Sequence, residues 1–388
     1  LENHFHAPGL EDISTPGGMT PESVRELSAY AAARGIDLVP GTNVLSHMEG
    51  WFRLERYSDF VDGAMRSYPV LTRPEVWKLV RTYLDALATA FPSPNFHAGL
   101  DELLFTGTNP EAAGAIAVRG KPGYFADFAC KVVNHLQKVH GKTVWMWDDM
   151  VLGKNIYRTE GFNDTYHEAL DRFPRDVIMT HWYYWTNSDG KHQTIMKRVA
   201  GAKRPFVVAP SSLTCGYDFG SLIRAADNQS YMARCGLKNG AFGLVNTQWE
   251  NRYGCSFLAG WPLQAMAAGF AWSGGTPPDS RFWNAFSFVL CGDQGALVRY
   301  LETIDRIQDL LNGHGVGPAA VRGLLFLHGP QRLWRQTTTG LTPTVRRQLR
   351  ILLATARKHH AAIGDRDPEL KRAMALGVTL FGEGLTII

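Results

Sequence analysis

The sequence predicts an α/β fold of the (β/α)8 barrel type, followed by a C-terminal helical region. Three observations lead to this prediction. Short apolar segments alternate with helix-like segments up to about residue 280, polar and aromatic clusters follow the apolar segments, and only helical periodicity continues beyond. The 388 residues leave room for a barrel of about 250 residues and an appended region.

The composition excludes several classes of protein. Apolar residues make up 45% and charged residues 20%, which is typical of a globular chain with a sizeable core. The net charge of +4 is small and the basic residues are scattered, so we expect no nucleic-acid partner. The sequence contains no apolar run of 18 residues, so we expect no membrane span. Five cysteines without a CxxC pair predict free thiols, not a zinc ribbon or a disulfide framework.

Three helices are predicted in the first part of the chain. Thr20 caps the first, which continues to a stop at Gly35. The run 72–75, Thr-Arg-Pro-Glu, has the pattern of a capping box before apolar residues at helical spacing. The third helix extends over about 124–139.

Six short apolar segments predict buried strands, at 36–39, 96–100, 143–147, 177–180, 206–209 and 242–245. With helices between them, they are typical of parallel βα units. Functional residues in such folds gather at the carboxyl ends of the strands. The candidates there are Asn43, His47, Asp101, Glu102, Trp147, Asp149, Trp182, Trp249 and Glu250.

From about residue 281 the strand signals stop. Apolar residues then repeat at helical spacing over 300–311 and 345–353. A Gly-Gly-Thr-Pro-Pro segment at 274–278 is a linker signal. The sequence therefore predicts a catalytic barrel over 1–280 and a helical region over 281–388 that packs on it.

Adjacent carboxylates at one strand end, Asp101 and Glu102, are the sharpest candidate site. Like charges so close raise the pKa of one of them, and this keeps a carboxylic acid protonated near neutrality. Successive side chains on a regular strand point to opposite faces, so both reach one site only where the strand ends or kinks. Gly99 offers that freedom. The alternative interpretation is a solvated acidic loop.

The segment 97–102, His-Ala-Gly-Leu-Asp-Glu, resembles the His-x-Gly-Gly-Asp-Glu signature of glycoside hydrolase family 20, the β-N-acetylhexosaminidases. Further segments resemble family motifs in the same order over roughly residues 1–280. Residues 39–47 resemble the family's strand-3 motif, with His47 at the position of the family's His. Trp147-Asp148-Asp149, Trp182 and Trp249-Glu250 resemble its motifs on strands 5, 6 and 8, and residues 261–273 resemble its closing helix.

The resemblance implies the removal of a terminal β-linked GlcNAc or GalNAc from an oligosaccharide or glycoconjugate, without a cofactor or metal. The nucleophile would be the acetamido oxygen of the substrate, in a retaining mechanism. Glu102 would be the general acid and then the base. Asp101 would hold the acetamido group and stabilise the cyclised intermediate.

This sequence departs from the family pattern in several places. Leu100 replaces the second Gly of the signature, and Asn43 stands where the family has Asp. The strand-7 Tyr-x-Asp has no match in 208–212, although Tyr217-Asp218 follows downstream. Residues 1–5 resemble the end of strand 2. Strand 1 and most of strand 2 are thus expected to be missing, either because the chain is a fragment or because another segment closes the barrel.

The remaining candidates each have a structural alternative. His47 either contacts substrate or makes a structural hydrogen bond, and His97 is expected to orient a carboxylate. Trp147, Trp182 and Trp249 are interpreted as sugar-stacking walls, with core packing as the alternative. Asp149 and Glu250 either bind sugar hydroxyls or pair with basic residues.

Two other functions remain open. A metal-dependent barrel hydrolase would use the His4-Phe5-His6 spacing, supplemented by His97, His181 and Asp101. A barrel that binds carbohydrate without catalysis is the other. The sequence leaves open the choice between GlcNAc and GalNAc and the oligomeric state. Leu1 is not followed by a signal-peptide pattern, but a processed or truncated N-terminus would have lost one, so a cytoplasmic and a secreted location both stay open.

Overall fold

A computed structural model describes residues 3–63, 66–103, 106–153, 166–185, 191–212, 219–249, 260–315 and 341–387. The chain forms two compact units. The first comprises Leu1–Trp182, Gly190–Val207 and Asn239–Phe242. The second comprises Tyr183–Asp189, Val208–Lys238 and Gly243–Ile388.

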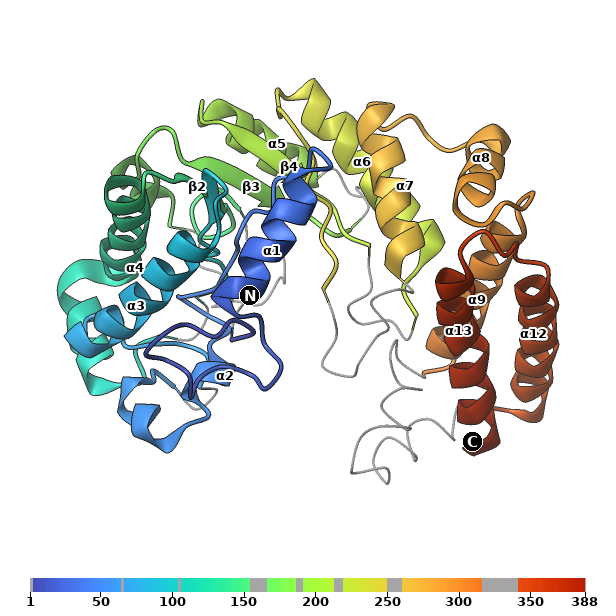
Figure 1. Ribbon diagram of the computed structural model, residues 1–388, viewed down its shortest axis with the longest axis horizontal. Coiled ribbons are helices and arrows are strands. Elements are labelled where there is room, and N and C mark those ends of the chain that lie inside the picture. Colours follow the sequence, from blue (N-terminus) through green and yellow to red (C-terminus); the bar gives the residue numbers. More distant parts are fainter. Residues whose placement is uncertain are drawn as a thin grey trace. The chain divides into compact units, whose positions relative to one another are not determined.

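A parallel sheet organises the first unit (Figure 1). Its strands follow the spatial order β1 (Asn95–His97), β2 (Thr143–Trp147), β3 (Ile178–Trp182) and β4 (Phe206–Ala209). Phe96 lies opposite Val144, and Met146 lies opposite Met179. All four side chains are fully buried, as expected for strands covered on both faces. The α/β class is confirmed, and the closed barrel of eight strands stays a prediction.

Helices of the first unit lie around this sheet, and α3 packs against α4, which also contacts β2 (Figure 1). They are α1 (Pro21–Ala32), α2 (Glu49–Phe52), the 3-10 turn η1 (Glu55–Phe60), α3 (Pro74–Ala90), α4 (Pro110–His140), the 3-10 turn η2 (His167–Arg172) and α5 (Lys191–Gly201).

The helix starts agree with the sequence only in part. Thr20 caps α1 as predicted, within a complete capping box. The predicted capping box of α3 is wrong, because Arg73 is its N-cap residue and the Thr72 hydroxyl bonds to Glu111 instead. Helix α4 begins well before the predicted start and contains a kink at Gly120, whose φ of 67° a glycine adopts readily.

Two predicted strands are wrong. Residues 36–39 form no strand, and Ile36 is 57% exposed, so this apolar run is not a buried one. Residues 242–245 contribute only an isolated parallel bridge between Val208 and Leu244, and Phe242 is 59% exposed. By contrast, β2 and β4 have the predicted bounds.

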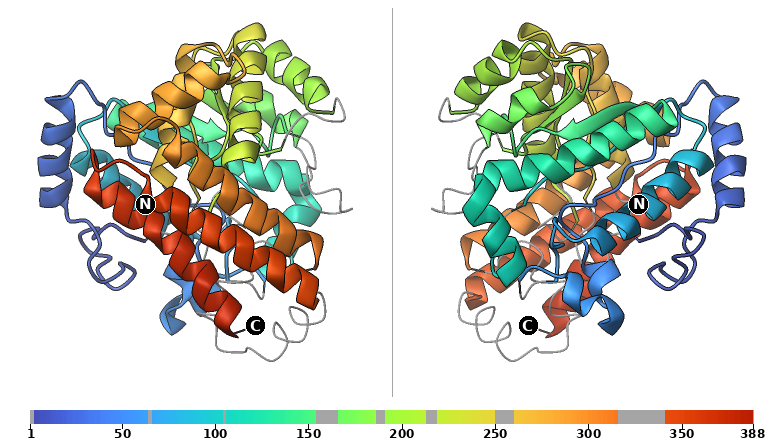
Figure 2. Two further views of the ribbon diagram at one scale, coloured as in Figure 1. Left: turned by 90° about the vertical axis from the view of Figure 1, so that its right-hand side faces the viewer. Right: turned by 90° about the vertical axis from the view of Figure 1, so that its left-hand side faces the viewer.

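The second unit is built from helices. They are α6 (Leu222–Lys238), α7 (Trp261–Trp272), α8 (Ser280–Cys291), α9 (Ala296–Gly313), α12 (Pro343–Ala361) and α13 (Pro368–Ile387). Figure 2 shows α9, α12 and α13 side by side. One apolar core joins α6 and α7 to these C-terminal helices through residues such as Leu222, Phe270, Leu301 and Leu349. The second unit includes residues on both sides of position 280, and the domains over 1–280 and 281–388 stay a prediction.

Two further predictions concern membranes and cysteines. None of the described helices has both the length and the apolar character needed to cross a membrane. Cys130, Cys235 and Cys291 are free thiols, as predicted, while Cys215 and Cys255 lie outside the described residues.

Candidate active site

The loop after β1 carries the carboxylate pair and has an unusual backbone. Gly99, Leu100 and Glu102 all have positive φ angles, of 70°, 70° and 49°. At Gly99 an added Cβ would lie 2.1 Å from Asn43 Oδ1 and 2.4 Å from the Thr42 carbonyl oxygen, so only glycine fits. Leu100 takes the same left-handed conformation at a cost of roughly 1–2 kcal/mol, and its side chain is fully buried.

This loop brings both carboxylates to one imidazole. His47 Nε2 lies 3.1 Å from Glu102 Oε2 and 3.7 Å from Asp101 Oδ2. The alternation of side chains along a strand does not separate the pair, because β1 ends at His97 and the turn follows. We name His47, Asp101 and Glu102 the His47 cluster.

Electrostatics make His47 the cation of this cluster. Burial alone lowers the pKa of a histidine, because it disfavours the charged form. The hydrogen bond to Glu102 and the charges of Asp101, Glu102 and Glu49 outweigh burial and raise the pKa of His47 to about 9. His47 therefore carries a positive charge at neutral pH and donates to Glu102.

Asp101 is fixed from the segment before α2. With its amide nitrogen facing its two acceptors, Asn43 donates to Asp101 Oδ1 over 3.1 Å and to the Thr42 carbonyl oxygen over 3.3 Å. The Ser46 hydroxyl donates to the backbone oxygen of Asp101 over 2.8 Å. Asn43 thus contacts the carboxylate pair by holding Asp101, while Ser46 is a neighbouring residue that the sequence did not single out.

Asp149 is the third carboxyl of the site. Its Oδ2 accepts a hydrogen bond from the backbone N–H of Glu102 over 3.0 Å. Burial raises its pKa well above the usual range, and the negative charges of Asp101, Glu102 and Asp148 add to this effect. Its Oδ1 is buried without a hydrogen-bond partner among the described residues. The structure thus places a carboxyl group with a raised pKa next to the adjacent pair, at Asp149.

His97 supports the loop through the backbone. Its Nδ1 accepts from the N–H of Gly99 over 3.2 Å, and its Nε2 lies 3.2 Å from the Thr180 hydroxyl. Burial lowers its pKa to about 3, so the ring is neutral. Through these contacts His97 orients the turn that carries both carboxylates. We had expected it to orient a carboxylate directly.

The four aromatic and acidic candidates at the later strand ends differ in placement. Trp147 and Trp182 end β2 and β3 and are 8% and 7% exposed, and the Trp147 ring lies 4.5 Å from that of His97. Trp249 belongs to the second unit, where its indole N–H donates to the Tyr184 hydroxyl over 2.6 Å. Glu250 lies outside the described residues, as does the Tyr217-Asp218 pair.

A buried polar chain next to the site was not predicted. Asp148 Oδ2 lies 2.7 Å from His181 Nδ1, and His181 Nε2 lies 2.9 Å from His192 Nε2. All three side chains are buried, and burial together with His181 lowers the pKa of His192 to about 2. The sequence offered one signal for this chain of contacts. Asp148 directly follows the apolar strand β2, and His181 lies within the neighbouring strand β3.

Metal-binding capacity can be judged from how donor atoms converge. Among the described residues, groups of three such donors within 4.8 Å of one another occur at the His47 cluster and at Asp85, His135 and His140. Neither group contains His4, His6, His97 or His181. The residues proposed for a metal-dependent hydrolase are therefore not gathered into one described site.

Comparison with known proteins gives a consistent family. The profile of glycosyl hydrolase family 20, catalytic domain, matches residues 7–214. A lacto-N-biosidase of Bifidobacterium bifidum is 25% identical over 191 residues, which cover 44% of this chain and 17% of that protein. A beta-hexosaminidase of Akkermansia muciniphila is 30% identical over 104 residues, covering 24% of this chain and 21% of that protein. The matched segments thus span about a fifth of the length of these curated relatives.

The fold also has a counterpart among solved structures. A crystal structure of a beta-N-acetylhexosaminidase aligns with a TM-score of 0.50 at 18% identity, over 71% of this chain and 62% of that chain. At this identity the likeness concerns the fold alone.

Proposed function

Because the chain belongs to glycosyl hydrolase family 20, we propose that it removes a terminal β-linked GlcNAc or GalNAc from an oligosaccharide or glycoconjugate. The reaction would be an exo-acting hydrolysis that retains configuration and uses the acetamido oxygen of the substrate as nucleophile. The observation that carries this proposal is the convergence of Asp101 and Glu102 on His47 Nε2.

Glu102 would act as the general acid and base. It would give a proton to the glycosidic oxygen while the acetamido oxygen attacks the anomeric carbon. It would then take a proton from the water that opens the cyclised intermediate. The hydrogen bond from His47 to Oε2 holds the Glu102 carboxyl in one place, and Glu102 would carry the proton that it donates on its other oxygen, Oε1.

Asp101 would stabilise the positive charge that develops on the cyclised acetamido group. The bond from Asn43 to Oδ1 fixes its carboxylate. With Asp149 protonated and His47 charged, the site has a net charge of about −1 when Asp101 and Glu102 are both ionised. A fixed negative charge in a water-poor site favours a cationic intermediate more than bulk water does.

Asp149 would hydrogen-bond the substrate through Oδ1. A buried polar atom without a partner costs about 1–3 kcal/mol, and a sugar hydroxyl or acetamido group would remove that cost on binding. We also propose that Trp147 and Trp182 contribute stacking surfaces in the first unit, as aromatic rings do for the apolar faces of sugars. The stacking role of Trp249, which belongs to the second unit, is a separate proposal.

A panel of aryl β-glycosides tests the proposal. The GlcNAc and GalNAc glycosides should be hydrolysed at least about 10²-fold faster than the glucoside and galactoside, because a well-placed internal nucleophile has a high effective molarity. Comparable rates with and without the acetamido group would contradict the mechanism. An aryl lacto-N-bioside belongs in the panel because of the name of the Bifidobacterium relative.

Two controls address the alternative functions. Turnover that falls strongly in a matched preparation of Asp101→Ala, which should slow aryl and natural substrates alike, excludes both a contaminating hydrolase and a barrel that only binds carbohydrate. Full activity in the presence of a chelator excludes a catalytic metal, whereas its loss would favour the metal-dependent hydrolase.

A further inference from the structure

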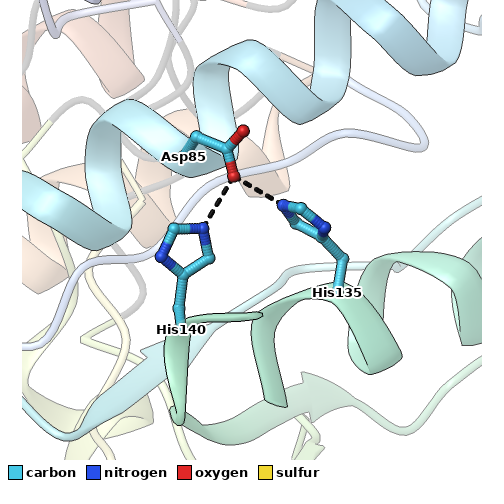
Figure 3. A group of neighbouring side chains, drawn as sticks. All are labelled: Asp85, His135 and His140. Carbon is cyan, nitrogen blue, oxygen red and sulfur yellow. Dashed lines mark hydrogen bonds and ion pairs between the residues drawn. The ribbon is translucent and has the colours of Figure 1, made fainter. Parts of the chain in front are cut away.

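A second cluster of histidines and carboxylate lies between two helices of the first unit (Figure 3). Asp85 comes from α3, and His135 and His140 come from α4. The two Nε2 atoms lie 2.5 Å and 2.6 Å from the same oxygen, Asp85 Oδ1. We name these three residues the Asp85 cluster, and it shares no residue with the His47 cluster.

The donor atoms converge from different sides of α4. Positions five apart on a regular helix point about 140° away from each other, so they do not meet simply by lying on one face. Figure 3 shows the two rings reaching Asp85 from either side. The Trp77 indole packs edge to face with the His135 ring, with the ring centroids 5.6 Å apart and an angle of 89° between the ring planes. This contact limits the orientation of the His135 ring.

The accessibility of the cluster suits an ion that enters from solvent. The His135 and His140 side chains are 12% and 16% exposed, whereas Asp85 is 42% exposed. The imidazole donors are thus shielded, and the carboxylate side is open. His140 is also the last residue of α4, where the helix dipole favours a positive charge.

Two imidazoles and one carboxylate are the ligands of a borderline transition metal. Ca²⁺ and Mg²⁺ require mainly oxygen ligands, whereas Zn²⁺ binds imidazole nitrogen at about 2.0–2.1 Å and carboxylate oxygen at a similar distance. Ligand atoms around a tetrahedral zinc ion lie roughly 3.3 Å apart. Asp85 Oδ1 would need to move away from each Nε2 by less than about 1 Å, which side-chain rotation provides.

We propose that Asp85, His135 and His140 bind a Zn²⁺ ion that joins α3 to α4. The fourth position would hold a water molecule, because the cluster offers three protein ligands. A metal that binds the folded state only shifts the folding equilibrium toward that state. The expected role is structural, because α3 and α4 both contribute to the first unit and α4 contacts β2.

Thermal unfolding with and without Zn²⁺ tests the site. At a free Zn²⁺ concentration 100 times the Kd, the folding equilibrium should shift by about 100-fold, which raises the Tm of a 388-residue chain by roughly 3 °C. The double variant His135→Gln/His140→Gln should lose this rise. His314→Gln serves as the matched control, because His314 is an exposed histidine at a helix end whose Nδ1 lies 3.0 Å from the Leu310 carbonyl oxygen. This control variant should keep the full rise.

Co²⁺ gives a second measurement that does not depend on stability. The wild-type protein and His314→Gln should develop the visible absorption of a four-coordinate Co²⁺ site, and the double variant should not. If the double variant does not fold, Asp85→Asn and His140→Gln are measured singly, and each should weaken Co²⁺ binding at least about 10-fold. An equal Zn²⁺ effect in wild type and variants, or none in the wild type, would show that the cluster is only an ion pair.

Discussion

The first unit holds two clusters that combine histidine and carboxylate in opposite proportions. In the His47 cluster two carboxylates share one imidazole, and in the Asp85 cluster two imidazoles share one carboxylate. The first is built on a turn with three positive φ angles, whereas the second is built on two regular helices. The backbone conformation that carries the first cluster therefore costs free energy, whereas the helical backbone of the second does not.

This difference indicates different tasks. An excess of carboxylate, held in place by a single cation and a strained turn, favours a positive charge that appears only during a reaction. Two imidazole nitrogens and one carboxylate oxygen held on helices favour a metal cation that stays bound. The predictions below alter one side of this contrast at a time.

The largest expected effect comes from Glu102→Gln. Loss of the general acid should slow natural oligosaccharides by about 10²–10⁴-fold. Aryl glycosides with acidic leaving phenols should slow much less, because these groups depart without a proton. Steady-state kinetics on both substrate types measure the difference.

Asp101→Ala is the counterpart that separates the two roles. It acts on the cyclisation that both substrate types share, so both should slow by similar factors. Binding of a thiazoline mimic of the cyclised intermediate should also weaken. If Asp101 were sensitive to the leaving group and Glu102 were not, the two roles would have to be exchanged.

Gly99→Ala tests whether the turn itself is required. The new Cβ meets Asn43 and the Thr42 carbonyl, so the turn must shift. We expect activity to fall by up to about 10²-fold and the free energy of unfolding to fall by roughly 2–4 kcal/mol.

Gly35→Ala is its matched control. Gly35 has a φ of 71°, and its added Cβ meets nothing within 4 Å. It should cost about 1–2 kcal/mol for the conformation alone and leave activity unchanged. Equal effects of the two substitutions on kcat/KM would mean that the turn does not position the carboxylates.

Asp149 gives a smaller effect, with a defined pH dependence. Because its pKa is raised, the folded state binds the proton more tightly than the unfolded state, and stability falls as the pH rises above the ordinary range of a carboxyl. Asp149→Asn removes this fall, so the variant should gain stability over wild type between pH 4 and pH 7.5 in urea unfolding. It should keep activity within about 10-fold, since an amide resembles a protonated carboxyl.

Asp149→Ala should lose more activity than Asp149→Asn, by about 10-fold. It removes the acceptor of the Glu102 N–H as well as the proposed substrate contact. If Asp149→Asn were as inactive as Asp149→Ala, this would indicate that Asp149 acts in its ionised form.

The smallest effect concerns the cation of the His47 cluster. NMR titration should give His47 a pKa of about 9, against 6.5 in the unfolded chain. The raised pKa stabilises the folded state below pH 6.5, and this contribution is lost as the pH rises toward 9. It should amount to about 1 kcal/mol, because solvent screens a side chain that is 40% exposed.

Glu102→Gln should lower this pKa, whereas Glu111→Gln should not. Glu111 is an acidic residue of the same unit that pairs with Arg73. An unchanged His47 pKa in Glu102→Gln would mean that the hydrogen bond does not hold the charge.

Local signals predicted some of the strands correctly and two of them wrongly. β2 and β4 have the predicted bounds because continuous apolar runs between polar ends are buried on both faces. The run at 36–39 is also mostly apolar, although it contains Asp37, and Ile36 and Val39 are exposed. Composition alone does not reveal which runs the tertiary structure covers. Asp101 and Glu102 were found because they are adjacent in sequence and follow a strand.

Contacts between distant residues were not predictable in the same way. Asp149 holds the raised pKa because β2 ends beside the turn after β1, and this depends on how the strands pair. The Asp85 cluster joins positions 50 and 55 residues apart on two helices, with no local motif. Such sites follow from packing, which a single sequence does not contain.

Leu100 has a consequence for the conformational entropy of the turn that carries Asp101 and Glu102. A glycine at this position would take the left-handed conformation without cost, but it would also allow many others in the free enzyme. The fully buried leucine side chain restricts both the unfolded chain and the folded turn to fewer conformations. The protein thus exchanges local strain for preorganisation, and little ordering of this turn remains to be done when a substrate arrives.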